Sequence, residues 1–154
     1  MRTRDVTDYK RRLDGLFKKH DSIPFDELEI RAHWARYLCV LISGFIEVSV
    51  KAIYIDYSRR KASPQVSNYV DARLNKLTNV SMNKLLNLTR DFSPQWEEAL
   101  RSVTEGELAA AVDSIVALRN QIAHGNNAAV SYSNIKDYYK RILQVIELLE
   151  RQCA

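Results

Sequence analysis

Apolar residues recur at helical spacing along almost the whole of this chain. Near the N-terminus, Val6, Leu13 and Phe17 fall on one face, with arginines and lysines opposite, which predicts an amphipathic helix over residues 4–19. A longer helix is expected from about residue 25 to 61. It starts amphipathic and becomes apolar on nearly every side through residues 37–55. A helix of this kind belongs at the centre of a bundle.

Serine, serine–proline and glycine residues mark the starts of further helices. These signals stand at residues 63–64, 81, 93–94 and 106. They predict helices over about 64–78, 82–92, 95–103 and 107–124, and a last apolar stripe predicts one over 134–152. No segment shows the sustained two-residue alternation of a strand. The sequence therefore predicts an all-α fold of about six or seven helices in a bundle around one long central helix.

Length and composition are those of one soluble domain spanning residues 1–154. Cys39 and Cys153 are too far apart in sequence for a zinc motif or a disulfide framework, and no signal peptide is recognisable. Glu47 and Lys51 interrupt the most apolar run, which argues against a membrane span. A cytoplasmic protein without membrane contact is expected.

The net charge of +4, with both signs mixed along the chain, accommodates a polyanion partner without demanding one. Several basic residues of the long helix could attract RNA and could equally serve only as its solvated face. They are Arg31, Arg36, Arg59, Arg60 and Lys61.

The stretch "VALRNQIAHGNN", residues 116–127, gathers an arginine, an amide and a histidine where a helix is expected to stop. Helix termination explains part of it, because a histidine suits a helix C-terminus and Gly125 suits the left-handed residue that ends a helix. Termination does not require Arg119 or Asn120. Asn120 and His124 lie one turn apart on a shared face.

The same three residues also fit chemistry on a phosphodiester. The guanidinium of Arg119 matches phosphate oxygens, and His124 can take or give a proton near neutral pH. Metal-dependent nucleases need acidic ligands, and the sequence has none between Asp113 and Asp137. The pattern therefore favours chemistry that uses neither a metal nor another cofactor.

The segment "RNQIAH", Arg119 to His124, resembles the arginine–four residues–histidine signature of HEPN domains, including the polar residue directly after the arginine. The setting is similar as well, since the signature ends a long penultimate helix and a short loop leads to the last one. The stretch "RYLCVLISGFIE" resembles the RiboL-PSP subgroup of HEPN proteins. The resemblance covers about residues 25–150 and implies a HEPN-like helical bundle.

The resemblance implies a metal-independent endoribonuclease that acts as a homodimer, with arginine and histidine of both copies lining one composite site. Arg119 would hold the phosphate, His124 would act as base or acid, and Asn120 would orient either of them. The products would carry 2′,3′-cyclic phosphate and 5′-hydroxyl ends. A second copy is also expected on chemical grounds. Cleavage needs both a base and an acid, and one chain offers a single well-placed histidine because His20 and His33 lie on other segments. Such a protein would be a toxin or defence effector with RNA as substrate, and an antitoxin or other partner protein is a further expectation.

Other residues near the signature leave two interpretations open. HEPN toxins modified by a nucleotidyltransferase carry a tyrosine two residues after the histidine, and this sequence has Asn126 there. Gly125, Asn126 and Asn127 could contact RNA or simply form a polar loop. Glu47 could pair with Lys51 one turn away, or it could reach across the bundle and orient Arg119.

Two alternatives to a nuclease remain. One is a non-catalytic HEPN-like dimeric scaffold or regulatory interaction module. The other sets the resemblance aside and treats the chain as a generic helical interaction module whose "RNQIAHG" only ends a helix. The joint presence of Arg119, Asn120 and His124 favours the nuclease over the scaffold, because a binding module needs no titratable group there.

Overall fold

The computed structural model describes residues 3–126 and 129–154, which form seven α-helices and no strand. The helices are α1 (Arg4–Asp21), α2 (Leu28–Lys61), α3 (Pro64–Leu74), α4 (Met82–Phe92), α5 (Pro94–Thr104), α6 (Glu107–Ala123) and α7 (Tyr132–Gln152). The all-α bundle expected from the sequence is confirmed.

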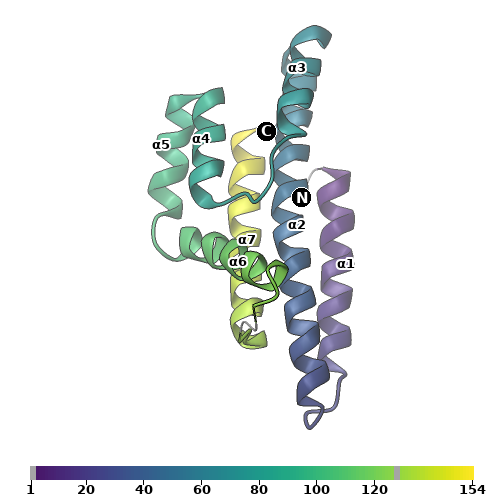
Figure 1. Cartoon of the computed structure of the whole chain (residues 1–154). Helices are drawn as coiled ribbons and strands as arrows, with labels where there is room; N and C mark the ends of the chain where they lie inside the picture. The colour runs from purple at the N-terminus through teal and green to yellow at the C-terminus, as the bar shows by residue number, and fades with distance from the viewer. Residues whose placement is uncertain (1–2, 127–128) are drawn as a thin grey trace.

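The long helix α2 forms the centre of the bundle (Figure 1). It packs against α1 on one side and against α6 and α7 on the other, while α3 contacts only its C-terminal end. Ile42, Phe45 and Val50 have no exposed surface, as expected for a helix that is apolar on nearly every side. By length and composition α2 could also cross a membrane, but 56% of its most apolar window is buried inside the bundle.

The serine caps predicted from the sequence are present. Ser63, Ser81 and Ser93 each accept a hydrogen bond from a backbone N–H in the first turn of the helix that follows. Ser131 caps α7 in the same way, so that this helix begins at Tyr132, two residues earlier than predicted. Side-chain capping of this kind satisfies N–H groups that have no partner inside the helix.

Two other predicted boundaries differ by more than two residues from those of the structure. The long helix begins at Leu28 and not near Phe25, because residues 24–27 form a turn closed by a hydrogen bond from the Glu27 N–H to the Pro24 carbonyl, 3.1 Å. The third helix ends at Leu74, four residues early. A loop follows it, in which Asn79 has φ +50°. Directly after Leu74 the chain tightens into i→i−3 turns, in which the Lys76 N–H donates to the Arg73 carbonyl at 3.3 Å and the Leu77 N–H to the Leu74 carbonyl at 3.0 Å, and the α-helix ends there.

Helix α6 crosses in front of α7, and its C-terminal end reaches α2 (Figure 1). The Cys39 thiol of α2 lies 3.8 Å from the carbonyl oxygen of Ile115 in α6, which joins the two helices at this point. Burial raises the pKa of the Cys39 thiol to about 12. The thiol is therefore a neutral packing group between the helix that carries the signature and the central helix.

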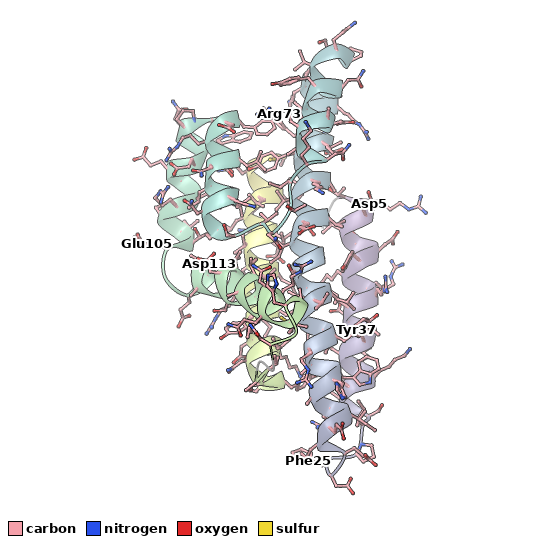
Figure 2. All side chains as sticks on the ribbon, in the orientation of Figure 1. Asp5, Phe25, Tyr37, Arg73, Glu105 and Asp113 are labelled. Carbon is pink, nitrogen blue, oxygen red and sulfur yellow. The ribbon has the colours of Figure 1, made fainter. Side chains whose placement is uncertain are left out.

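Two residues before Ile115, α6 is also fastened to the start of α4. The carboxylate of Asp113, labelled in Figure 2, accepts a hydrogen bond from the backbone N–H of Met82 at 2.9 Å. Together with the contact between Cys39 and Ile115, this bond fixes the direction in which α6 leaves the core. The signature at its C-terminal end is thus held by contacts made one and two turns earlier.

Candidate active site

The C-terminal end of α6 is closed by its own backbone. Gly125 has φ +73°, the left-handed conformation predicted for it. Its N–H donates to the carbonyl of Ile122 at 3.1 Å, and the Asn126 N–H donates to the carbonyl of Gln121 at 3.0 Å. These two bonds form a Schellman motif, which satisfies the last carbonyls of a helix without any side chain.

Because the backbone completes this cap, the imidazole of His124 is not needed for it. His124 is exposed, and its ring makes no hydrogen bond or ion pair with any of the residues that the structure describes. The helix-end interpretation thus explains Gly125 fully and the imidazole of His124 not at all. The ring is free to meet a ligand or a second protein chain.

Arg119 and Asn120 form a pair on the half-buried border of α6. The Nη1 of Arg119 donates to the Oδ1 of Asn120 at 3.3 Å. Within the described part of the chain no carboxylate lies within ion-pair distance of this guanidinium. Arg119 thus keeps its full charge and most of its donors, while the amide restrains one end of the fork.

The single chain brings together only part of the expected set. Arg119 contacts Asn120, but no hydrogen bond links either of them to the imidazole of His124 among the residues described. Within one chain the three groups therefore make no closed hydrogen-bonded triad. They offer a restrained cation with an amide, and a separate exposed proton-transfer group one turn further on.

Glu47 forms neither of the two pairs considered for it. Its Oε1 accepts a hydrogen bond from the backbone N–H of Asn79 at 2.8 Å, and no ion pair with Lys51 or Arg119 is formed. A carboxylate on a half-buried helix face needs a donor, and the left-handed residue of the α3–α4 loop supplies it. Glu47 holds a loop in place here.

The residues after the histidine are polar and exposed. Gly125 and Asn126 belong to the cap and extend into solvent, while Asn127 lies outside the described residues. Their contact with RNA stays a prediction. Among the residues described, no group of three or more histidine, cysteine or acidic side chains could hold a metal ion.

The sequence analysis missed an arginine–histidine contact on α2. Arg36 donates from Nη2 to Nδ1 of His33 at 3.3 Å. The two residues are three positions apart and therefore share a helix face. That three-residue spacing is the signal in the sequence that could have predicted the contact.

His20 is a second residue whose position only the fold reveals. Its ring is fully buried and stacks on Tyr132, the first residue of α7, with the ring centroids 3.5 Å apart. Burial, followed by the nearby charge of Arg31, lowers the pKa of His20. The residue is therefore a neutral packing element at the start of α7 and is not available as a second catalytic histidine.

Comparison with known protein families identifies the family of this chain. The profile of the RiboL-PSP-HEPN family matches residues 4–154, essentially the whole chain. No curated protein and no solved structure matches it. The matched region includes every helix of the bundle and the signature at the end of α6. The chain belongs to the RiboL-PSP-HEPN family of HEPN domains.

Proposed function

We propose that this protein is a metal-independent endoribonuclease that acts as a homodimer with a composite arginine–histidine site. One observation carries the proposal. A restrained but unneutralised Arg119 stands five residues, about 1.4 turns, from an exposed His124 whose ring makes no hydrogen bond or ion pair with the described residues. A stable helix end would need neither side chain, because its backbone is already satisfied.

The reaction would be attack of a ribose on its own phosphate. A neutral imidazole takes the proton from the 2′-hydroxyl, and O2′ forms a bond to phosphorus. The bond from phosphorus to O5′ of the next nucleotide breaks, and an imidazolium donates a proton to that oxygen. The products are a 2′,3′-cyclic phosphate and a 5′-hydroxyl. Arg119 stabilises the charge that develops on the phosphate oxygens, and Asn120 keeps its fork oriented.

Two proton-transfer groups on opposite sides of the phosphate are required, and each chain offers one. A two-fold axis near the C-terminal end of α6 would supply a second His124 and a second Arg119 to the same site. The exposure of His124 supports this arrangement, because a group that serves a composite site must lie on the surface of the single chain.

The biological setting is proposed from the family. As the likeness to HEPN ribonucleases implies, we propose a cytoplasmic toxin or defence effector that is restrained by a partner protein. Its substrate would be recognised mainly through the phosphate backbone.

Incubation of the purified protein with end-labelled RNA in EDTA tests the proposal. We expect cleavage that leaves cyclic phosphate ends, and we expect His124→Ala and Arg119→Ala each to reduce its rate by at least about 100-fold. Asn120→Ala should reduce it less. Arg151→Ala, an exposed arginine at the end of α7, is the matched control and should cleave like the wild type.

The outcomes separate the alternatives. Cleavage that EDTA abolishes would contradict the metal-independent mechanism, and equal cleavage by the wild type and His124→Ala would trace the activity to a contaminant. Absence of cleavage on every RNA tested, together with a dimer in sedimentation, would favour the non-catalytic HEPN scaffold.

A further inference from the structure

The contact between Arg36 and His33 lies on the part of α2 that adjoins the signature. Arg36 precedes Cys39 by three residues, and Arg119 follows Ile115 by four. Each arginine is thus one helical turn from the point where the Cys39 thiol meets the Ile115 carbonyl.

The charge of Arg36 is not neutralised by a carboxylate. At the other end of the same helix, Arg59 pairs with Asp71 and Arg60 with Asp56, both at 2.9 Å. The one side-chain partner of Arg36 within the described ranges is the Nδ1 atom of His33. An imidazole nitrogen that accepts a hydrogen bond is neutral, so the guanidinium keeps its full positive charge.

The histidine restrains the arginine. Because arginine only donates, the Nδ1 atom of His33 must be the acceptor, and the ring proton is then on Nε2. The Nε2 atom lies 3.7 Å from a carboxylate oxygen of Glu29, one turn earlier. Glu29, His33 and Arg36 therefore form a row along α2, and Arg36 is the member of the row closest in sequence to Cys39.

An arginine that is held by one hydrogen bond and still has free donors is suited to a phosphate. We propose that Arg36, positioned by His33, binds a phosphate of the RNA next to the one held by Arg119. This inference rests on the proposed function and extends its site from the end of α6 to the surface of α2. The contact is made to the backbone, so it adds affinity without sequence preference.

Binding of a fully 2′-O-methylated single-stranded oligonucleotide tests the proposal, because this probe keeps the phosphates but has no 2′-hydroxyl that can attack. Its Kd is measured by fluorescence anisotropy over a series of salt concentrations. Arg36→Ala is expected to raise Kd about tenfold and to reduce the slope of log Kd against log salt by about 0.7, the contribution of one phosphate contact on a single strand. Arg59→Ala is the matched control and should change neither quantity.

His33 is tested as a positioning residue. His33→Gln keeps an acceptor for Arg36 and should bind the oligonucleotide like the wild type, whereas His33→Leu removes the acceptor and should weaken binding by about threefold. In cleavage assays Arg36→Ala should raise KM and leave kcat nearly unchanged, in contrast to Arg119→Ala. Thermal unfolding is expected to change little in the four variants on α2, because His33 and Arg59 are exposed, Arg36 is half-buried, and an exposed ion pair such as that of Arg59 with Asp71 contributes little to stability.

A wild-type Kd and salt slope for Arg36→Ala would overturn the proposal, as would failure of the wild type to bind the probe. Binding by His33→Leu equal to that of the wild type would remove the positioning role. The binding measurement does not depend on catalysis. Loss of probe binding in Arg36→Ala with no cleavage by any form of the protein would therefore contradict only the nuclease proposal. Cleavage by the wild type with unchanged probe binding in Arg36→Ala would contradict only this inference.

Discussion

Glu47 and Asn79 are joined by a hydrogen bond from the Asn79 backbone N–H to the Glu47 carboxylate, 2.8 Å long. Asn79 is in the left-handed conformation, which no other non-glycine residue in the described segments adopts. Three residues later the Asp113 carboxylate accepts from the Met82 N–H. Carboxylates of α2 and α6 thus hold the two ends of the segment that leads into α4.

Loss of the Glu47 carboxylate should affect mainly the stability of the protein and not its catalytic activity. Glu47→Ala leaves a half-buried N–H without its acceptor, so we expect the free energy of unfolding to fall by about 1 to 3 kcal/mol. Glu47→Gln keeps an acceptor oxygen and should cost less. Urea unfolding measures both, with RNA cleavage followed in parallel. Cleavage lost in Glu47→Gln at unchanged stability would contradict the loop-holding role and restore a role at Arg119.

At the C-terminal end of α6, substitutions of His124 and Gly125 are expected to affect stability differently. His124→Ala should leave the free energy of unfolding within about 0.5 kcal/mol of the wild type, because the backbone alone closes the helix. Gly125→Ala places a Cβ on a residue with φ +73° and should cost about 1 to 2 kcal/mol. Chemical denaturation of the two variants checks this. A large loss of stability in His124→Ala would mean that the imidazole does help to end the helix.

Gly44 lies where α1 approaches the central helix. A Cβ added at Gly44 would lie 2.7 Å from the hydroxyl oxygen of Tyr9, and that hydroxyl donates to the carbonyl of Leu41 at 2.8 Å. Gly44→Ala should therefore destabilise the protein by about 1 to 2 kcal/mol through overpacking.

The effect of Gly44→Ala on stability should change sign when the Tyr9 hydroxyl is absent. The nearest ring carbon of Tyr9 would be 3.8 Å from the new Cβ, an ordinary contact. In the Tyr9→Phe background Gly44→Ala is expected to stabilise by about 0.5 to 1 kcal/mol, the usual gain of alanine over glycine inside a helix. A double-mutant cycle by urea unfolding measures the difference. Equal effects of Gly44→Ala in both backgrounds would show that the hydroxyl is not the obstacle.

Because of His20, the protein is expected to lose stability in mild acid. Its pKa in the folded protein is lowered from 6.5, so the unfolded chain binds the proton more readily than the folded one. Stability is complete above about pH 6.5 and falls as the pH drops from there through the folded pKa, by at most about 1.4 kcal/mol for each pH unit. Asp21, whose own pKa is lowered from 3.8 mainly by the Tyr132 hydroxyl, contributes only in a lower pH range.

His20→Phe isolates this effect, because phenylalanine keeps a ring against Tyr132 and cannot be protonated. Neither ring nitrogen of His20 has a hydrogen-bond partner among the described residues, so the substitution should not lower stability at pH 7.5. Denaturant unfolding from pH 7.5 to 5 should show a smaller loss for His20→Phe than for the wild type. Parallel curves for the two proteins would mean that His20 is not the group that titrates.

Local signals in the sequence were sufficient for the helices and for most of their ends. The serine caps at residues 63, 81 and 93 and the left-handed Gly125 depend on neighbours within a few positions, and the structure confirms them. The third helix was predicted too long because residues 75–78 have no strong helix breaker. The chain turns away directly after Leu74, and the loop that follows is held by the bond from the Asn79 N–H to Glu47, 32 positions away.

The sequence by itself determined the all-α bundle, the central position of α2 and the presence of Arg119, Asn120 and His124 at one helix end, because apolar spacing and capping are local properties. Only the tertiary structure decided which polar side chains have hydrogen-bond or ion-pair partners and which do not. It assigned Glu47 to a loop, buried His20 against Tyr132, and left the imidazole of His124 and the charge of Arg36 without a neutralising partner in the described part of the chain. The contacts of Glu47 with Asn79 and of His20 with Tyr132 join residues far apart in sequence, and helical spacing carries no information about them.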